Sequence, residues 1–240
     1  MKVAIVTGGT SGIGREISKQ FVLRGDKVIA IYASNDKKAM EAQQEINNKN
    51  FITKKLDVTN EALVKEFFAT IPQIDYLINC AGTSILSNFE EQNIDEIKRI
   101  MDINLYGKMH CCKYAIPQLK KSSEARIINI ASRFAQKPFM EGVMAYCCSM
   151  TAIEMMSRVL ALELAKYGIR VNTVSPSLTI TPLTTKLYTE DTIDSIESKN
   201  PSGRLGKVSD VANVVMFLCS ERSDYINGEN INVNGGILLI

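Results

Sequence analysis

The stretch Thr7–Gly14, TGGTSGIG, is the most informative segment of the sequence. It follows the apolar, β-branched segment Lys2–Thr7, and it opens a segment in which Ile13, Ile17 and Phe21 recur at helical spacing. A glycine-rich turn between a strand and a helix brings backbone N–H groups and the positive helix end together, which favours binding of a pyrophosphate. Glycines also serve tight turns without a ligand, and that structural interpretation stays open at this point.

The rest of the chain continues this alternation of strand-like and helical patterns. A second helical pattern places Ile153, Met156, Leu160 and Leu164 on one face. Strict alternation predicts βαβ units, a parallel sheet and helices on both faces. Six further apolar runs are predicted strands: Lys27–Ala33, Phe51–Val58, Ile74–Gly82, Ala125–Ser132, Ile169–Pro176 and Asn230–Val233.

Composition narrows the function classes. The 240 residues are 45% hydrophobic and 22% charged, with a net charge of +2 and no basic stripe, so we expect no nucleic-acid partner. The first apolar run is too short for a signal peptide or a membrane span, so we expect a cytoplasmic protein with no membrane contact. Six cysteines include two adjacent pairs but no C-x-x-C, which predicts reduced core thiols and no metal site.

Several further motifs make the chain resemble the short-chain dehydrogenase/reductase family from end to end. TGGTSGIG is similar to the family's cofactor turn, and VNTVSPSLTITPL to its segment after the sixth strand, except that Ser177 replaces a glycine. Within the family, the chain is most similar to 3-oxoacyl-[acyl-carrier-protein] reductases. The other motifs are LDVT at Leu56–Thr59, NCAG at Asn79–Gly82, MDINLYG, IINIAS, AYCCSM and GENINVNGG.

The resemblance implies a Rossmann-type fold and a set of catalytic residues, Ser132, Tyr146 and Asn104. We expect an α/β fold with one doubly wound parallel sheet of about seven strands, in a single domain over residues 1–240 with an excursion at about 181–203. Ser132 ends a strand, where its hydroxyl could bind a substrate carbonyl, and the phenol of Tyr146 could donate a proton. Asn104 would hold a water or a helix bend. Each residue also has a purely structural alternative: Ser132 as a turn serine, Tyr146 as a core tyrosine and Asn104 as a surface amide.

The resemblance also implies a nicotinamide dinucleotide. NADP is predicted over NAD, because Tyr32 stands where an NAD enzyme usually has a carboxylate, and Lys37 or Lys38 can add positive charge. The predicted cofactor-binding residues are Gly8, Ser11, Gly12, Ile13, Gly14, Tyr32, Ser34, Asn35, Asp57, Val58, Asn79, Ala81, Gly82, Pro176 and Thr181.

Met150 departs from the family pattern. The family has a lysine four residues after the tyrosine, on the same helix face, where its ammonium favours the phenolate. Losing a shift of ~3 pKa units corresponds to ~4 kcal/mol, or ~10³-fold in rate. Three interpretations remain. The chain is an engineered variant, disabled or weakened by a near-isosteric replacement of the lysine, in which Met150→Lys raises turnover. Alternatively, it is a natural enzyme whose cation comes from Lys137 or Arg133, or it is a catalytically silent dinucleotide-binding protein with a regulatory or partner-binding role.

The predicted activity is NADP(H)-dependent reduction of a ketone, in a 3-oxoacyl thioester, to a hydroxyl. The substrate would be a small molecule or an acyl group on a carrier protein, and the apolar residues Leu183, Leu187, Tyr188 and Ile193 of the excursion would line its pocket. The resemblance implies a homotetramer, which agrees with the apolar C-terminal run ILLI. A purely structural or interaction protein is the third class.

Overall fold

Seven parallel strands form the centre of the molecule. The structure is a computed structural model that describes residues 1–239. The strand order is β3-β2-β1-β4-β5-β6-β7, and every neighbouring pair is parallel. The predicted doubly wound parallel sheet is confirmed. The strands are β1 (Val3–Thr7), β2 (Lys27–Tyr32), β3 (Phe51–Lys55), β4 (Tyr76–Asn79), β5 (Arg126–Ile130), β6 (Arg170–Pro176) and β7 (Asn230–Val233).

Most of the predicted strands end earlier than expected at their carboxyl ends. The β4 pairing with β1 stops at Asn79 opposite Thr7, because β1 itself ends there in the glycine turn. Cys80–Gly82 therefore leave the sheet as a loop, and so do the last residues of the predicted strands ending at Val58 and Ser132. Several of the residues that leave the sheet are predicted site residues: Asp57, Val58, Ala81, Gly82 and Ser132.

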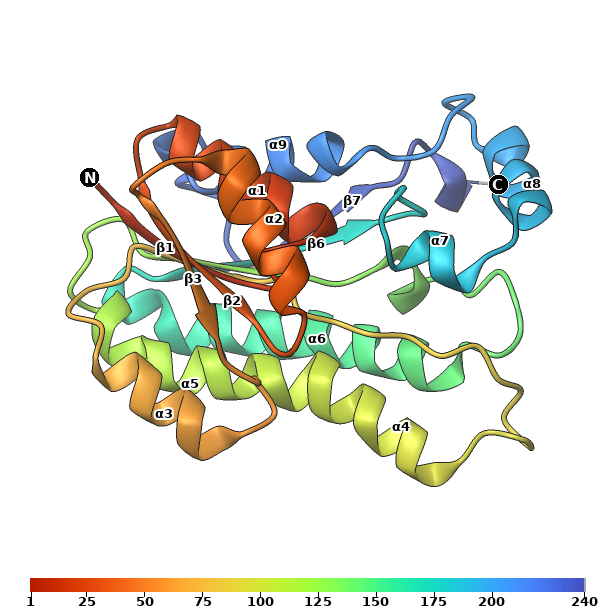
Figure 1. Cartoon of the computed structure of the whole chain (residues 1–240), viewed down its shortest axis with the longest axis horizontal. Helices are drawn as coiled ribbons and strands as arrows, with labels where there is room; N and C mark the ends of the chain where they lie inside the picture. Colours follow the sequence, from red (N-terminus) through yellow and green to blue (C-terminus); the bar gives the residue numbers. More distant parts are fainter. Residues whose placement is uncertain (240) are drawn as a thin grey trace.

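Helices cover both faces of this sheet (Figure 1). On one face, Ile17 and Phe21 of α1 pack against Val6 and Ala30 of the sheet. On the other face, Phe68 and Leu119 are fully buried within the second core cluster. The first face carries α1 (Gly12–Leu23), α2 (Asp36–Ile46) and α9 (Val208–Leu218), and the second carries α3 (Glu61–Ala69), α4 (Ile94–Met101), α5 (Gly107–Leu119) and α6 (Met144–Leu164).

The strand order reverses between β1 and β4. From β1 the chain winds outward through β2 and β3, and from β4 it winds the other way through β5, β6 and β7. In open parallel sheets, ligands bind in the crevice beyond the carboxyl ends of the strands at such a switch point. The turn Thr7–Gly14 and the loop Cys80–Gly82 both lie there.

The predicted excursion at 181–203 holds two short helices, α7 (Thr184–Leu187) and α8 (Glu190–Lys199), which Figure 1 shows near the C-terminus. A small apolar cluster of Leu178, Ile196 and Leu205 anchors them. In the apolar C-terminal run, Ile237 is buried whereas Leu239 is 88% exposed, so the run is only partly exposed to solvent. Ile240 lies outside the described residues.

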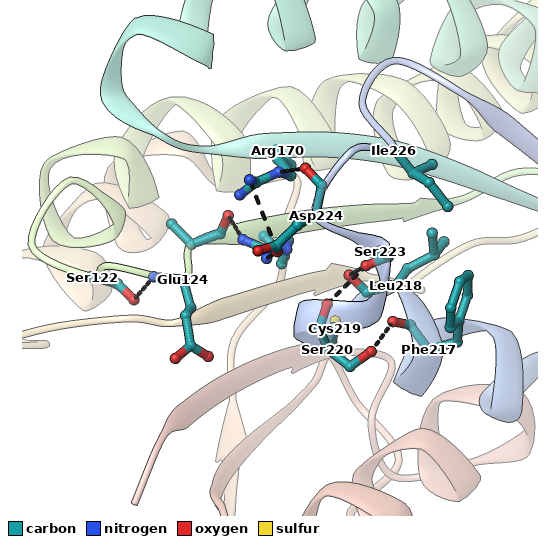
Figure 2. A network of polar contacts seen from close by, with 12 residues as sticks. Ser122, Glu124, Arg170, Phe217, Leu218, Cys219, Ser220, Ser223, Asp224 and Ile226 are labelled. Atoms are coloured by element: carbon teal, nitrogen blue, oxygen red, sulfur yellow. Dashed lines mark hydrogen bonds and ion pairs between the residues drawn. The ribbon is translucent and has the colours of Figure 1, made fainter.

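A polar network connects the amino ends of β5 and β6, the ends away from the crevice, with the C-terminal part of the chain (Figure 2). Arg126 opens β5, is 2% exposed, and donates to the Asp224 carboxylate at 2.5 Å. Arg170 opens β6 and donates to the backbone oxygen of Asp224. Because this network lies at the amino ends of the strands, it stabilises the scaffold on the side away from the crevice.

The remaining composition-based expectations concern cysteines and membranes. All six cysteines are free thiols, but Cys148 is exposed, so the expectation that all are core residues is wrong for it. Cys148 lies near the start of α6 and is not among the buried residues of that helix, which there are Ala145, Ser149 and Met150. Within residues 1–239, no helix combines the length and apolar character that crossing a bilayer requires.

Candidate active site

The glycine turn is shaped by close packing and by left-handed backbone. Gly8 and Gly12 have φ of +66° and +52°, which side-chain-bearing residues rarely adopt. A Cβ on Gly14 would lie 2.3 Å from the carbonyl oxygen of Gly8, so only glycine lets α1 start this close to the turn. Ser11 is the N-cap residue, and its side chain makes no capping hydrogen bond. The first N–H groups of α1 are thus placed to hold a phosphate.

A cavity of about 510 Å³ extends from this turn along the ends of β1, β2 and β4. It is also lined by Lys38, one of the two lysines expected to add charge there, and by Arg99, which the sequence analysis did not name. Gly12, Ile13 and Gly14 do not line it. The predicted residues that it brings together are Gly8, Ser11, Tyr32, Ser34, Asn35, Asp57, Val58, Ala81 and Gly82.

Polar residues at the far end of this cavity are partly engaged in local structure. The Tyr32 hydroxyl donates to Asp36 at 3.0 Å, and the ammonium of Lys55 donates to the same carboxylate at 2.8 Å. These hydrogen bonds, led by that of Lys55, lower the pKa of Asp36. Asn35 caps α2 by accepting from the Lys38 N–H at 2.9 Å, which leaves its amide N–H groups for a ligand.

A second cavity, of about 140 Å³, joins the cofactor turn to the predicted catalytic set. Ser132, Tyr146 and Met150 line it together with Ile13 of the turn. Pro176 and Thr181 also lie on its wall, as predicted for cofactor contacts. Asn79 lines neither of the two cavities, and its fully buried side chain donates to Asn129 at 2.8 Å.

Ser132 and Tyr146 interact directly. Burial raises the pKa of Tyr146 to about 12, and a hydrogen bond with Ser132 opposes part of that rise. The Tyr146 ring also packs edge-on against Phe134, with ring centroids 5.8 Å apart. Ser132 accepts from the Phe134 N–H at 3.3 Å, so it is a turn serine as well as a cavity residue. The phenol is therefore held, protonated, at the cavity wall.

Asn104 lies in a π-helical segment, Asp102–Tyr106, between α4 and α5. It is fully buried, so the alternative of a surface amide is wrong. Its amide nitrogen donates to the Thr83 carbonyl and the Ser149 hydroxyl, each at 3.0 Å, and its oxygen accepts from the Thr83 N–H at 2.8 Å. Asn104 thereby ties the loop after β4 to α6, on which Tyr146 lies.

Met150 is an apolar wall of this cavity. It is 3% exposed and packs with Leu105, Ala131 and Ile153. Of the two cations suggested as substitutes, Arg133 is absent from this cavity but lines a neighbouring one of about 70 Å³ with Ser132 and Tyr146. Its guanidinium stacks on the Phe139 ring at 3.8 Å. Burial raises the pKa of the Tyr188 phenol, and the charge of Arg133 opposes part of that rise. Lys137 lines a larger cavity of about 560 Å³ that includes neither Tyr146 nor Met150.

Sequence reasoning missed Lys108, a cation that does line the cavity of Tyr146 and Met150. Lys108 is 2% exposed, and its ammonium donates to the carbonyl oxygens of Asn79 at 2.9 Å and Ala81 at 2.8 Å. Burial lowers the pKa of Lys108 to about 8. The sequence contained one indication of this position. Lys108 is four residues after Asn104 and lies on the same helix face as Cys111 and Cys112, which were predicted to be core residues.

Comparisons with known proteins cover nearly the whole chain. A family model described as enoyl-(acyl carrier protein) reductase matches residues 8–238. An NAD-dependent glycerol dehydrogenase of Listeria innocua is 33% identical over 98% of this chain and 93% of its own. The 3-oxoacyl-[acyl-carrier-protein] reductase FabG of Staphylococcus aureus is 31% identical over 99% and 98%. A solved short-chain type dehydrogenase/reductase from Mycobacterium ulcerans superposes with a TM-score of 0.92 at 27% identity, over 99% of this chain and 90% of that one.

Proposed function

Because this chain belongs to the short-chain dehydrogenase/reductase family, we propose that it is an NADP(H)-dependent reductase of a ketone in a 3-oxoacyl thioester. The observation that carries the proposal is the shared cavity, in which Ser132 and the protonated phenol of Tyr146 lie beside Ile13 of the glycine turn. A binding protein without chemistry needs the turn but has no need of a phenol and a serine hydroxyl in hydrogen-bond contact at that place.

The described residues fit a nicotinamide dinucleotide. The turn offers backbone N–H groups and glycines at positive φ, and the cavity of about 510 Å³ continues from it toward Tyr32 and Asp57. When bound, the cofactor supplies the hydride. Ser132 would donate its hydroxyl hydrogen to the substrate carbonyl oxygen, and Tyr146 would deliver a proton to the same oxygen.

The substrate side of the site is narrow and has an apolar part. A cavity of about 70 Å³ is lined by apolar and aromatic side chains and by polar ones; the former are Phe134, Phe139, Leu178, Leu183, Leu187 and Tyr188, and the latter are Ser84, Ser132, Arg133, Tyr146, Ser177 and Thr184. Its apolar part suits a short acyl chain. This is our reason for proposing a thioester substrate, small or carrier-bound, over the glycerol that the name of the Listeria relative gives.

Steady-state assays test this function. We expect oxidation of NADPH in the presence of short 3-oxoacyl thioesters, and slower turnover of glycerol with either oxidised dinucleotide. Faster oxidation of glycerol would replace the proposed substrate class by polyols. Tight cofactor binding without turnover of any carbonyl or alcohol would favour the silent dinucleotide-binding protein instead.

The preference for NADP is supported by the charges at the adenosine end of the larger cavity. Lys38 lines that cavity, and Asp36 is already engaged by Lys55. We expect Lys38→Ala to weaken NADPH binding about 5-fold, the equivalent of ~1 kcal/mol for an exposed charged contact, and to leave NADH binding unchanged. Fluorescence titration measures both constants. The matched control is Lys37→Ala, because Lys37 does not line the cavity; equal losses in both variants would contradict this placement.

We also propose a cytoplasmic homotetramer that assembles through α6. Met155, Val159 and Leu162 are 56%, 44% and 82% exposed, and their spacing places them on one face of α6. We expect Leu162→Glu to convert the tetramer to smaller species in light scattering at micromolar concentration. Leu23→Glu, at a 77% exposed leucine of α1, should leave the mass unchanged. A monomeric unmodified chain would rule out this assembly.

A further inference from the structure

Lys108 is a buried ammonium whose hydrogen-bonding capacity is incompletely used. An ammonium has three N–H donors, and two of them go to the carbonyl oxygens of Asn79 and Ala81. Within residues 1–239 no carboxylate forms an ion pair with Lys108, and the groups whose charges act on it are the thiols Cys80, Cys111 and Cys112. One donor is therefore left at a cavity wall.

This lysine is unexpected on its helix face. The neighbouring buried residues of α5 are Cys111, Cys112, Ala115 and Leu119, which form an apolar stripe against the sheet. Burying a charge without a counter-ion costs free energy that two carbonyl contacts offset only in part. A residue of no functional use at this place would be apolar, so the charge itself points to a ligand.

The place of Lys108 limits what that ligand is. Of its two anchors, Asn79 ends β4 and Ala81 lies in the loop that follows, at the switch point of the sheet, and the cavity that Lys108 lines is also lined by Ile13 and Tyr146. A ligand group there lies between the phosphate-binding turn and the proton donor. On the proposed function, that group is the ribose that bears the nicotinamide, whose hydroxyls accept hydrogen bonds.

We infer, on the basis of the proposed function, that Lys108 is the cation of this site and that its remaining N–H binds a hydroxyl of the nicotinamide-bearing ribose. The cation thus comes from α5 and not from position 150 on α6. Met150 is then the apolar neighbour that keeps a second ammonium out of a cavity of about 140 Å³. Tyr146 is not among the groups whose charges act on Lys108, so the role of Lys108 is to position the cofactor beside the phenol.

Titration gives this inference a distinct signature. The pKa of Lys108 is lowered to about 8, whereas burial raises the pKa of Cys80 to about 11 and of Cys112 to about 12. The pKa of Cys111 is raised as well, and that of Tyr146 is raised to about 12. Around pH 8 only Lys108 changes charge in this group. Because the ammonium binds the hydroxyl better than the amine does, cofactor affinity should fall as the pH rises above about 8.

Fluorescence titration of the full-length chain with NADPH between pH 7 and pH 9.5 tests the inference. We expect Lys108→Met to weaken binding at pH 7 about 10-fold, the loss of one hydrogen bond to a charged group, and to abolish the pH dependence. Lys108→Gln keeps N–H donors for the two carbonyls without the charge, and it should lose as much affinity as Lys108→Met; full affinity in Lys108→Gln would overturn the role of the charge. Lys113→Met, at an exposed lysine of the same helix, is the control and should match the unmodified chain.

Transfer of the cation provides the second arm. Met150→Lys in the Lys108→Met background should restore at least half of the lost affinity, whereas Met150→Lys alone should not raise turnover, because two ammonium groups would share one cavity. The inference is overturned if the Lys108 variants keep the original affinity and pH dependence, or if Met150→Lys alone raises turnover at least 10-fold. If the Lys108 variants lose affinity but no carbonyl substrate turns over, the inference stands and the proposed reductase function fails.

Discussion

Tyr146→Phe is expected to lower kcat for carbonyl reduction by about 10³-fold, in the middle of the range for a general acid. The phenol lies at the wall of the cavity, in hydrogen-bond contact with Ser132, and phenylalanine keeps the ring and its packing on Phe134 while removing the proton. Cofactor affinity should change little, because the backbone of the glycine turn is untouched. Steady-state kinetics and a parallel NADPH titration measure the two quantities.

The pH dependence provides a further check on Tyr146. Its pKa is raised to about 12, so the phenol is protonated throughout the neutral range and the reduction rate should not decline through loss of its proton below about pH 10. The reverse reaction requires phenolate, and its rate should therefore rise with pH in the unmodified chain but not in Tyr146→Phe. Tyr225→Phe, at an exposed phenol, is the control. Unchanged kcat in Tyr146→Phe would remove Tyr146 from the proton-transfer step.

Gly14→Val should weaken dinucleotide binding at least about 100-fold, because it displaces several N–H donors that each contribute ~1.5–3 kcal/mol to a charged phosphate. A Cβ at this position would meet the Gly8 carbonyl oxygen at 2.3 Å, and backbone cannot rotate away as a flexible side chain can. The turn must therefore open or α1 must shift. Calorimetry with NADPH and NADH measures the loss for both cofactors.

Two further variants separate a local effect on the turn from general damage. Gly12→Ala adds a Cβ whose nearest contact is Thr181 at 3.4 Å, but it strains a backbone with φ of +52°, so we expect an intermediate loss of affinity. Gly203→Ala, also at positive φ but with open space around it, should bind the cofactor normally. Circular dichroism establishes that each variant is folded. Full affinity in a folded Gly14→Val chain would show that the pyrophosphate binds elsewhere.

Local sequence patterns determined the strands, the glycine turn and the helix that carries Tyr146. Alternation of β-branched runs with helical spacing is a property of neighbouring residues, so it identified every strand of the sheet. The ends of the strands could not be predicted in the same way, because pairing stops where the partner strand stops. β4 ends at Asn79 since β1 has already turned away at Thr7. The side chain of Asn79, expected at the cofactor, is in the core, because in-register pairing of β4 with β5 places it beside Asn129, to which it donates.

The charge at the site was decided by tertiary structure alone. Helical periodicity marks position 150 as a neighbour of Tyr146 on α6, so the sequence showed that a lysine is absent there. It gave no means to choose among distant cations. Arg133 stacks on the Phe139 ring beside a smaller cavity that it shares with Tyr146, and Lys137 lines a separate cavity. Lys108 reaches the cavity because α5 packs against the end of β4. Periodicity determines which face of a helix is buried, but what that face meets depends on how elements far apart in the chain pack together.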